Sequence, residues 1–167
     1  ISVTSLDPRL SGLLEPRAAS PAKRLAALGK LAAAGVPTHV GVAPVIPCVT
    51  DEFMERILKE AAARGVPSAS WIMVRLPHEV APLFREWLEV HFPDRAGKVM
   101  GIVQSIRGGK DYDASFFTRM KPLGPWADLF RHRFRLACKR SGLNRDQPRL
   151  DCSRFIPPER DGQLRLL

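Results

Sequence analysis

The fold that we expect depends on the first stretch of the chain, Ile1-Ser-Val-Thr-Ser-Leu-Asp-Pro-Arg-Leu-Ser-Gly-Leu-Leu-Glu-Pro-Arg17. The stretch begins inside a β-branched run, residues 1–4, and the turn-forming pair Asp7-Pro8 ends that run. A strand at the first residue needs partner strands, and the sequence offers candidates only downstream. Because there is also no initiator Met, we expect the chain to be part of a longer protein.

Two further strands are predicted, at residues 36–46 and 68–76, and each follows a helix. The first helix begins at Ser20-Pro21 and ends at Gly35, and the second follows the capping pair Thr50-Asp51 and ends at Gly65. The run at 36–46 is apolar at nearly every position, so we expect a strand buried on both faces. The order strand, helix, strand, helix, strand predicts a parallel α/β layer with right-handed crossovers.

The second half of the chain is predicted to be helical. Helices are expected at residues 79–91, with Pro82 in the first turn, at 93–106 and at 125–141, the last followed by Gly142. An irregular loop separates the last two helices at residues 107–124, and loops of this length are often functional. The tail from residue 143 is polar and proline-bearing, and we expect it to be extended over the surface.

The charge balance favours an anionic partner. The chain of 167 residues has 26 Lys and Arg against 17 Asp and Glu, a formal charge of +9, and its pI is near 10.2. Nucleic acid is the commonest such partner, although a basic surface alone is a weak signal. Cys48, Cys138 and Cys152 match no metal or redox spacing. We predict a cytoplasmic protein with reduced thiols and no membrane segment.

Three cations follow one another at helical spacing in the last predicted helix. Arg131, Arg135 and Lys139 occupy positions i, i+4 and i+8, so they share one face. Such a row contacts phosphates in some proteins and is only a solvated helix face in others. Both interpretations are kept for this helix.

The segment Arg107-Gly-Gly-Lys110 resembles part of a phosphate-binding loop. Gln104 and Asp111 stand where a P-loop requires Gly and Ser or Thr, which excludes binding of a nucleoside triphosphate by that route. Either the preceding helix simply ends on the glycines, or their N–H groups form an anion-binding nest beside Arg107 and Lys110.

Polar residues follow the ends of the predicted strands, where ligands bind in barrels and open α/β sheets. Ser5 and Asp7 follow the first strand, and Thr50 and Arg75 follow the others, so the four could converge on one ligand. The alternative for Ser5 and Asp7 is that they only hold the turn.

These strand ends resemble a known family, and the resemblance covers nearly the whole chain. The matching segments are Thr4-Ser-Leu-Asp-Pro8, Glu15-Pro-Arg-Ala-Ala-Ser-Pro21, Val42-Ala-Pro-Val-Ile-Pro47, Arg75-Leu-Pro-His-Glu-Val80 and Arg107-Gly-Gly-Lys-Asp-Tyr-Asp113. They resemble a bacterial subfamily of the radical SAM superfamily that is related to spore photoproduct lyase and described as DNA repair photolyase-like. The resemblance implies an α/β fold: residues 1–77 as the back half, three parallel strands with helices, of a partial (β/α)6 barrel. Residues 78–142 would be an α-helical extension packed on it, and 143–167 an extended tail.

The resemblance also implies the cofactors S-adenosyl-L-methionine (SAM) and a [4Fe-4S] cluster. It implies that Ser5 contacts SAM and that the backbone around residues 44–47 and 76 lies near the adenosine. The candidate cofactor-binding residues are Ser5, Asp7, Pro44, Ile46, Pro47 and Leu76. The family holds its cluster through Cys-x-x-x-Cys-x-x-Cys, a motif that this sequence lacks, so we expect an N-terminal half-barrel to supply it.

Two functions therefore remain in view. The first is the C-terminal portion of a radical SAM enzyme that acts on DNA or another large anionic substrate, with phosphate contacts from Arg107, Lys110, Arg131, Arg135 and Lys139. The second is a non-catalytic basic nucleic-acid-binding or scaffold domain that retains a half-barrel. On either interpretation the isolated chain is expected to build no cluster.

Overall fold

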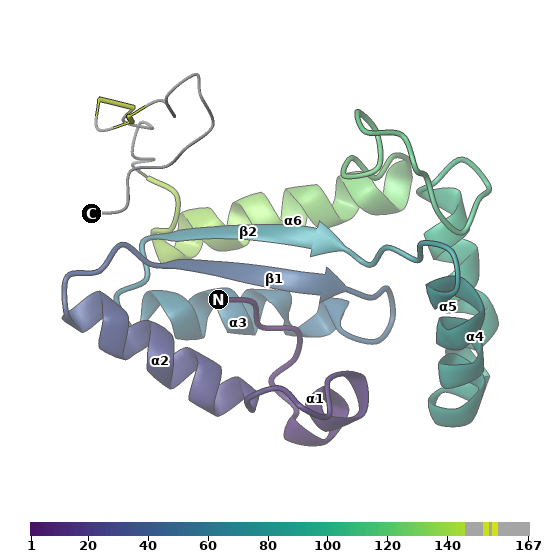
Figure 1. Ribbon diagram of the computed structural model, residues 1–167, viewed down its shortest axis with the longest axis horizontal. Helices are drawn as coiled ribbons and strands as arrows, with labels where there is room; N and C mark the ends of the chain where they lie inside the picture. The colour runs from purple at the N-terminus through teal and green to yellow at the C-terminus, as the bar shows by residue number, and fades with distance from the viewer. Residues whose placement is uncertain (146–151, 154, 157–167) are drawn as a thin grey trace.

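The computed structural model describes residues 1–145, 152–153 and 155–156, and Figure 1 shows the arrangement of its elements. The elements, in chain order, are α1 (Pro8–Leu14), α2 (Pro21–Ala33), β1 (His39–Val45), the 3-10 turn η1 (Asp51–Phe53), α3 (Met54–Ala62), β2 (Ser68–Met73), α4 (Val80–His91), α5 (Pro93–Ser105) and α6 (Pro125–Ser141). The helices α2, α3 and α6 accompany the two strands, and α4 and α5 stand at the carboxyl ends of the strands (Figure 1).

The sheet has two strands in the described part of the chain, so the expected three-stranded half-barrel is wrong. β1 and β2 are parallel, with His39 opposite Ser68 and Val42 opposite Trp71. The first residues contribute a single parallel bridge between Ser2 and Gly41. The chain then bends at Leu6 and enters α1 at Pro8, so the segment before α1 forms a bridge rather than a third strand.

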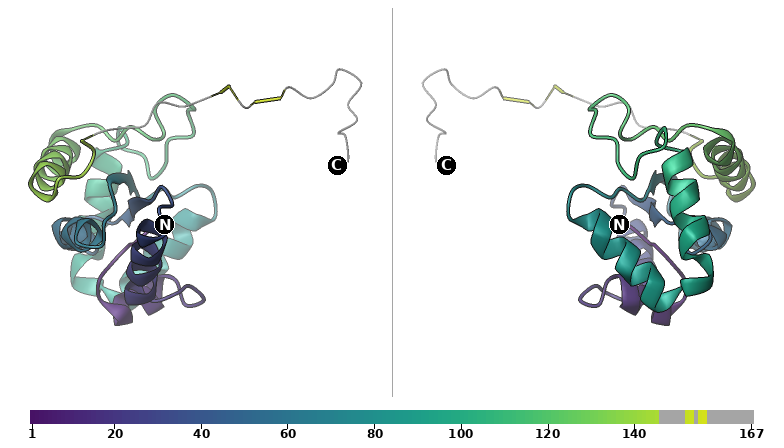
Figure 2. Two further views of the ribbon diagram at one scale, coloured as in Figure 1. Left: turned by 90° about the vertical axis from the view of Figure 1, so that its left-hand side faces the viewer. Right: turned by 90° about the vertical axis from the view of Figure 1, so that its right-hand side faces the viewer.

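The two faces of the sheet differ in burial, so the expectation of a strand buried on both faces is also wrong. Val40 and Val42 of β1 and Met73 of β2 are buried in the core. The opposite face carries His39, which is exposed, and Ile72, which is 40% exposed. Seen along the strands, α2, α3 and α6 lie around one face of the sheet (Figure 2).

The hydrophobic core consists of two clusters. The larger lies under the sheet between α2, α3 and α6, where the rings of Trp71 and Phe130 meet edge to face with centroids 4.9 Å apart. The second lies at the carboxyl ends of the strands, where Ile46 and Leu76 pack with Leu88 of α4 and Val103 of α5. The second cluster therefore fixes α4 and α5 against the strand ends.

The predicted helix boundaries in the described residues hold to within a few residues. Ser20 caps α2, Pro82 lies in the first turn of α4, and Gly142 ends α6 in the left-handed region at φ 72°. Sequence reasoning missed α1, which Asp7 caps by accepting a hydrogen bond from the Arg9 N–H at 2.8 Å. The predicted tail at 143–167 lies largely outside the described residues.

Thr50 was predicted to cap a helix, but its side chain makes no capping hydrogen bond. Its Oγ1 accepts a hydrogen bond from the Ile46 N–H at 2.8 Å and donates to the Pro44 carbonyl at 3.2 Å. The hydroxyl is buried and closes the turn after β1, so it is unavailable to the helix that follows.

Asn144 lies against the outer edge of β2. Its Oδ1 accepts a hydrogen bond from the Ala69 N–H at 2.8 Å, and its Nδ2 donates to the Ala69 carbonyl at 3.0 Å. The side-chain amide thus satisfies both backbone groups of a residue whose outer side has no partner strand among the described residues. As for membranes, none of the helices within the described ranges is long and apolar enough to span one.

Candidate functional site

A cleft of about 540 Å³ lies where β1 and β2 end, a size typical of small-molecule sites. We call it the strand-end cleft. The residues that line it include Ser2, Glu15, Pro44, Ile46, Arg75, Leu76, Val80 and Phe84. Its walls are mainly apolar, so polar recognition depends on few groups. The structure thus brings together three of the six candidate cofactor residues, namely Pro44, Ile46 and Leu76.

Two side chains of opposite charge line the strand-end cleft. The Glu15 carboxylate accepts a hydrogen bond from the Thr4 hydroxyl at 3.2 Å and forms an ion pair with Arg24, whose Nη2 lies 3.0 Å away. The Arg75 guanidinium donates through Nη1 to the Met120 Sδ at 3.3 Å. Sequence reasoning had Arg75 at a strand end but did not select Glu15, because that residue approaches the cleft only through the fold.

Ser5 and Asp7 lie outside the strand-end cleft and hold the turn before α1. The fully buried Ser5 hydroxyl accepts a hydrogen bond from the Asp7 N–H at 2.9 Å. The Asp7 carboxylate is occupied at the start of α1. Pro47 is buried and also lies outside the lining of the cleft, and Thr50 is occupied by its turn. Of the four polar residues expected to converge, only Arg75 reaches the cleft.

Arg107 is buried, with 8% of its surface exposed, and it fastens the loop at residues 107–124. Its Nη1 donates to the Arg119 carbonyl at 2.6 Å and its Nη2 to the Val74 carbonyl at 3.5 Å. Burial lowers the pKa of this guanidinium, Asp113 opposes that shift, and Arg75 adds to it. A guanidinium committed to two carbonyls is a poor phosphate ligand, whereas Lys110 beside it is exposed.

The three cations predicted to share one face of α6 are all exposed: Arg131, Arg135 and Lys139. Arg131 forms an ion pair with Asp128 and donates to the Pro122 carbonyl at 3.1 Å. Arg135 lies 3.1 Å from the His132 ring nitrogen. The row is thus open to solvent, although Asp128 neutralises part of its charge.

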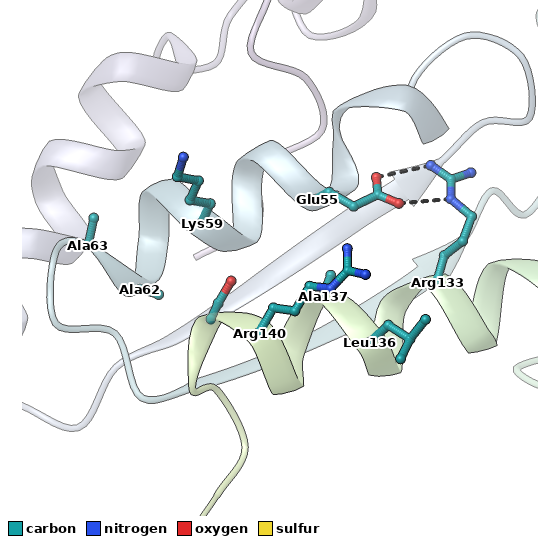
Figure 3. A pocket seen from close by; sticks show the side chains of 9 residues that line it. Glu55, Lys59, Ala62, Ala63, Arg133, Leu136, Ala137 and Arg140 are labelled. Atoms are coloured by element: carbon teal, nitrogen blue, oxygen red, sulfur yellow. Dashed lines mark hydrogen bonds and ion pairs between the residues drawn. The ribbon is translucent and has the colours of Figure 1, made fainter.

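A second cavity, of about 630 Å³, lies between α3 and α6 (Figure 3). The Glu55 carboxylate there accepts two hydrogen bonds from Arg133, at 2.8 Å from Nε and 3.0 Å from Nη2. These hydrogen bonds from Arg133 to Glu55 are the main reason that the pKa of Arg133 is raised. Lys59 and Arg140 line the same groove. No sequence signal marked it, because its residues come from helices far apart in the chain.

His39 forms a hydrogen-bonded chain with two serines on the open face of the sheet. Ser68 Oγ donates to the Thr38 carbonyl at 3.2 Å and therefore accepts from His39 Nδ1 at 2.9 Å. Nε2 of the neutral ring then accepts from Ser70 Oγ at 2.8 Å. Desolvation lowers the pKa of His39, and the N-terminal ammonium adds to the effect.

The cysteines do not fit an iron-sulfur cluster. No group of three His, Cys, Asp or Glu that could hold a metal ion occurs among the described residues. Cys138 lies in the core, and its burial raises the pKa of the thiol to about 11. Cluster ligation needs thiolates that lie together, and a buried protonated thiol supplies none.

Comparison with known proteins gives relatives without a described activity. The chain is 32% identical over 96 residues to the uncharacterized protein Rv2578c of Mycobacterium tuberculosis and to the uncharacterized protein Mb2609c of Mycobacterium bovis. The match covers 56% of this chain and 28% of the length of each relative, so the chain corresponds to a minor part of them. No family model matches the chain. No solved structure matches it either.

Proposed function

We propose that this chain contributes the adenosine-binding cleft of a radical SAM enzyme. The observation that carries the proposal is the strand-end cleft itself, because Pro44, Ile46 and Leu76 line it together. These residues come from two separate segments that resemble SAM-contacting parts of that superfamily. The proposal concerns the cleft and the chemistry of its lining, and it does not depend on a barrel.

The lining suits the parts of SAM. Pro44 and the exposed side chains of Ile72 and Val80 offer apolar surface to an adenine ring, whereas Ile46 and Leu76 are 1% exposed and line the cleft from the core. The Glu15 carboxylate can accept hydrogen bonds from ribose hydroxyls, as acidic residues do in dinucleotide sites. Arg75 can attract the carboxylate of the methionine part. SAM, when reductively cleaved, supplies a 5'-deoxyadenosyl radical, whereas this chain's own residues bind and orient the nucleoside.

The test measures SAM binding to the whole chain by isothermal titration calorimetry. Val80 lines the cleft near the start of α4, and Val80→Trp should fill it and weaken SAM binding by at least about tenfold. Val90→Trp is the matched control, because Val90 lies on the same helix, is 72% exposed and is not part of the lining. Absence of SAM binding to the unaltered chain, or equal binding to both variants, would overturn the proposal.

A related test concerns the cluster. We expect anaerobic reconstitution with iron and sulfide to leave the isolated chain without a cluster, because its described residues hold no ligand set. A stoichiometric four-iron signal would contradict this expectation. Such a signal would not decide whether the strand-end cleft binds SAM, which the calorimetric measurement tests independently.

The second candidate function is contact with nucleic acid. The exposed cationic row of α6, together with the formal charge of +9, supports it. Replacing Arg131, Arg135 and Lys139 with Ala should weaken DNA binding and flatten its salt dependence, since each lost phosphate contact lowers the slope by about 0.9 for duplex DNA.

A charge-matched control distinguishes this row from bulk charge. Arg17, Lys23 and Lys30 are also exposed, and replacing them with Ala removes the same charge elsewhere on the molecule. If both triple variants bind duplex DNA equally, α6 has no special role. If the unaltered chain binds no DNA at low salt, the candidate function is wrong.

A further inference from the structure

The loop at residues 107–124 presents an exposed apolar surface that the core does not use. Its members are Phe116, Phe117, Met120 and Leu123, which are 73%, 78%, 48% and 64% exposed. We call these four residues the aromatic tip. The two phenyl rings meet edge to face with centroids 5.5 Å apart. Exposed large side chains are ordinary when scattered singly, whereas several of them on one loop, two in direct contact, indicate an interaction site.

The loop that carries the aromatic tip is fastened at several points. The Asp111 carboxylate accepts hydrogen bonds from Arg85 Nη2 at 2.7 Å and from Gln104 Nε2 at 2.9 Å. Arg107 holds the Arg119 carbonyl, and the Leu123 N–H donates to the Ile106 carbonyl at 3.1 Å. The loop backbone that carries the rings is therefore held in place before any partner arrives, which reduces the entropy lost on binding.

Asp113 organises the turn that contains the two rings. Its carboxylate accepts hydrogen bonds from the Ser115 N–H at 2.9 Å and from the Thr118 hydroxyl. Both hydrogen bonds lower the pKa of Asp113, and the one from Thr118 has the larger effect. With Asp111 paired to Arg85, both acidic groups of the loop are engaged within the protein.

The charges around the aromatic tip that remain available are positive. The Arg119 guanidinium carbon lies 5.1 Å from the centre of the Phe116 ring. Lys110 and Lys121 are exposed in the same loop. A partner for this surface must offer flat apolar faces together with negative charge, and an unpaired nucleic-acid strand does so with its bases and phosphates.

We propose that the aromatic tip is a stacking platform for unpaired bases of a single-stranded nucleic acid. The inference rests on the nucleic-acid contact considered above as the second candidate function, and it adds to it a site for bases. The rings of Phe116 and Phe117 stack on bases, and Lys110, Arg119 and Lys121 accompany the phosphates. The Met120 contact to Arg75 places the tip next to the strand-end cleft.

The experiment uses fluorescence anisotropy to measure two affinities of the whole chain. One is for a labelled single DNA strand of about 12 nucleotides, and the other is for the duplex of the same sequence. Replacing Phe116 and Phe117 with Ala should weaken single-strand binding by roughly five- to a hundredfold for each base that loses its stacking ring, and leave duplex binding unchanged. Phe116→Trp with Phe117→Trp should preserve or strengthen single-strand binding. The salt slope should stay the same in these variants, because stacking engages no phosphate.

Leu83→Ala with Val90→Ala is the control, because both residues are exposed on α4, outside the loop. Thermal unfolding by circular dichroism should be unchanged in all these variants, since the replaced side chains are exposed. If the unaltered chain binds neither DNA, the nucleic-acid function and the stacking platform both fail. If single-strand binding persists and the Phe-to-Ala variant keeps it in full, the platform alone is wrong.

Vesicles of phosphatidylcholine and phosphatidylserine test the other surface that takes exposed phenyl rings and cations. We expect no binding of the chain to these vesicles that depends on Phe116 and Phe117. Vesicle binding that is lost in the Phe-to-Ala variant, with no change in single-strand affinity, would overturn the inference in favour of a lipid surface.

Discussion

The two faces of the β1–β2 sheet differ in the size and polarity of their side chains. The covered face presents Val40, Val42 and Met73 to the helices, whereas the open face alternates with them and presents His39 and Ile72. β1 looks apolar at nearly every position along the sequence, because Gly41 and Ala43 count as apolar although they bury little surface. The comparison teaches that in β1 side-chain size, rather than polarity alone, separates the covered face from the open one.

The largest effect is expected from substituting neighbours on opposite faces. Met73 is 2% exposed and Ile72 is 40% exposed. Met73→Ala should lower the free energy of unfolding by about 2–5 kcal/mol, because it leaves a cavity in the core. Ile72→Ala should lower it by about 0.5 kcal/mol or less, as surface substitutions do. Urea denaturation measures both, and equal losses would show that the open face is buried in solution.

A second prediction tests the burial of the covered face through the thiol of Cys138, which lies in the core beneath it. Burial raises the pKa of Cys138 from an ordinary value of 9.0 to about 11, so its thiolate is about a hundredfold scarcer at neutral pH. A disulfide reagent should therefore label the exposed Cys152 first and Cys138 much more slowly. The slow phase should vanish in Cys138→Ser. A native chain whose thiols all react at one rate would contradict the packing of α6 on the sheet.

The smallest effect concerns His39 on the open face. Its pKa lies below the usual 6.5 in the folded chain, so the unfolded chain binds this proton more readily. The contribution to stability is present above pH 6.5 and is lost as the pH falls through the folded pKa. The urea midpoint should therefore drop slightly between roughly pH 7.5 and pH 5.5. His39→Gln should remove the part of this decrease in the urea midpoint that comes from His39. If the variant shows the same pH dependence as the unaltered chain, His39 does not contribute to it.

Features encoded by neighbouring residues could be predicted from the sequence. Ser20-Pro21 and Gly142 act within one turn of their helices, and both ends lie where the sequence indicated. Thr50 was interpreted in the same way, but its hydroxyl bonds to Ile46 and Pro44 instead. The number of strands depends on pairing between distant segments, which periodicity does not encode, and that part of the fold prediction failed.

The candidate site shows the same division. Pro44, Ile46 and Leu76 were selected from motifs and do line one cleft, whereas Ser5 and Asp7 from the same motifs hold a turn. The difference arises because a motif specifies which residues are present. It does not specify which of their polar groups form hydrogen bonds within the local turn and are therefore unavailable to a ligand. Arg107 could not be distinguished from an exposed cation, since its burial depends on carbonyls supplied by distant segments.

The amide of Asn144 has a consequence for association between molecules. A parallel sheet of two strands leaves the outer edge of β2 able to pair with a strand from another chain, which is how edge-to-edge aggregation begins. By occupying both backbone groups of Ala69, Asn144 removes from that edge one pair of hydrogen-bonding groups that an incoming strand would use. One side chain after α6 thus acts as a local barrier against unwanted β-assembly.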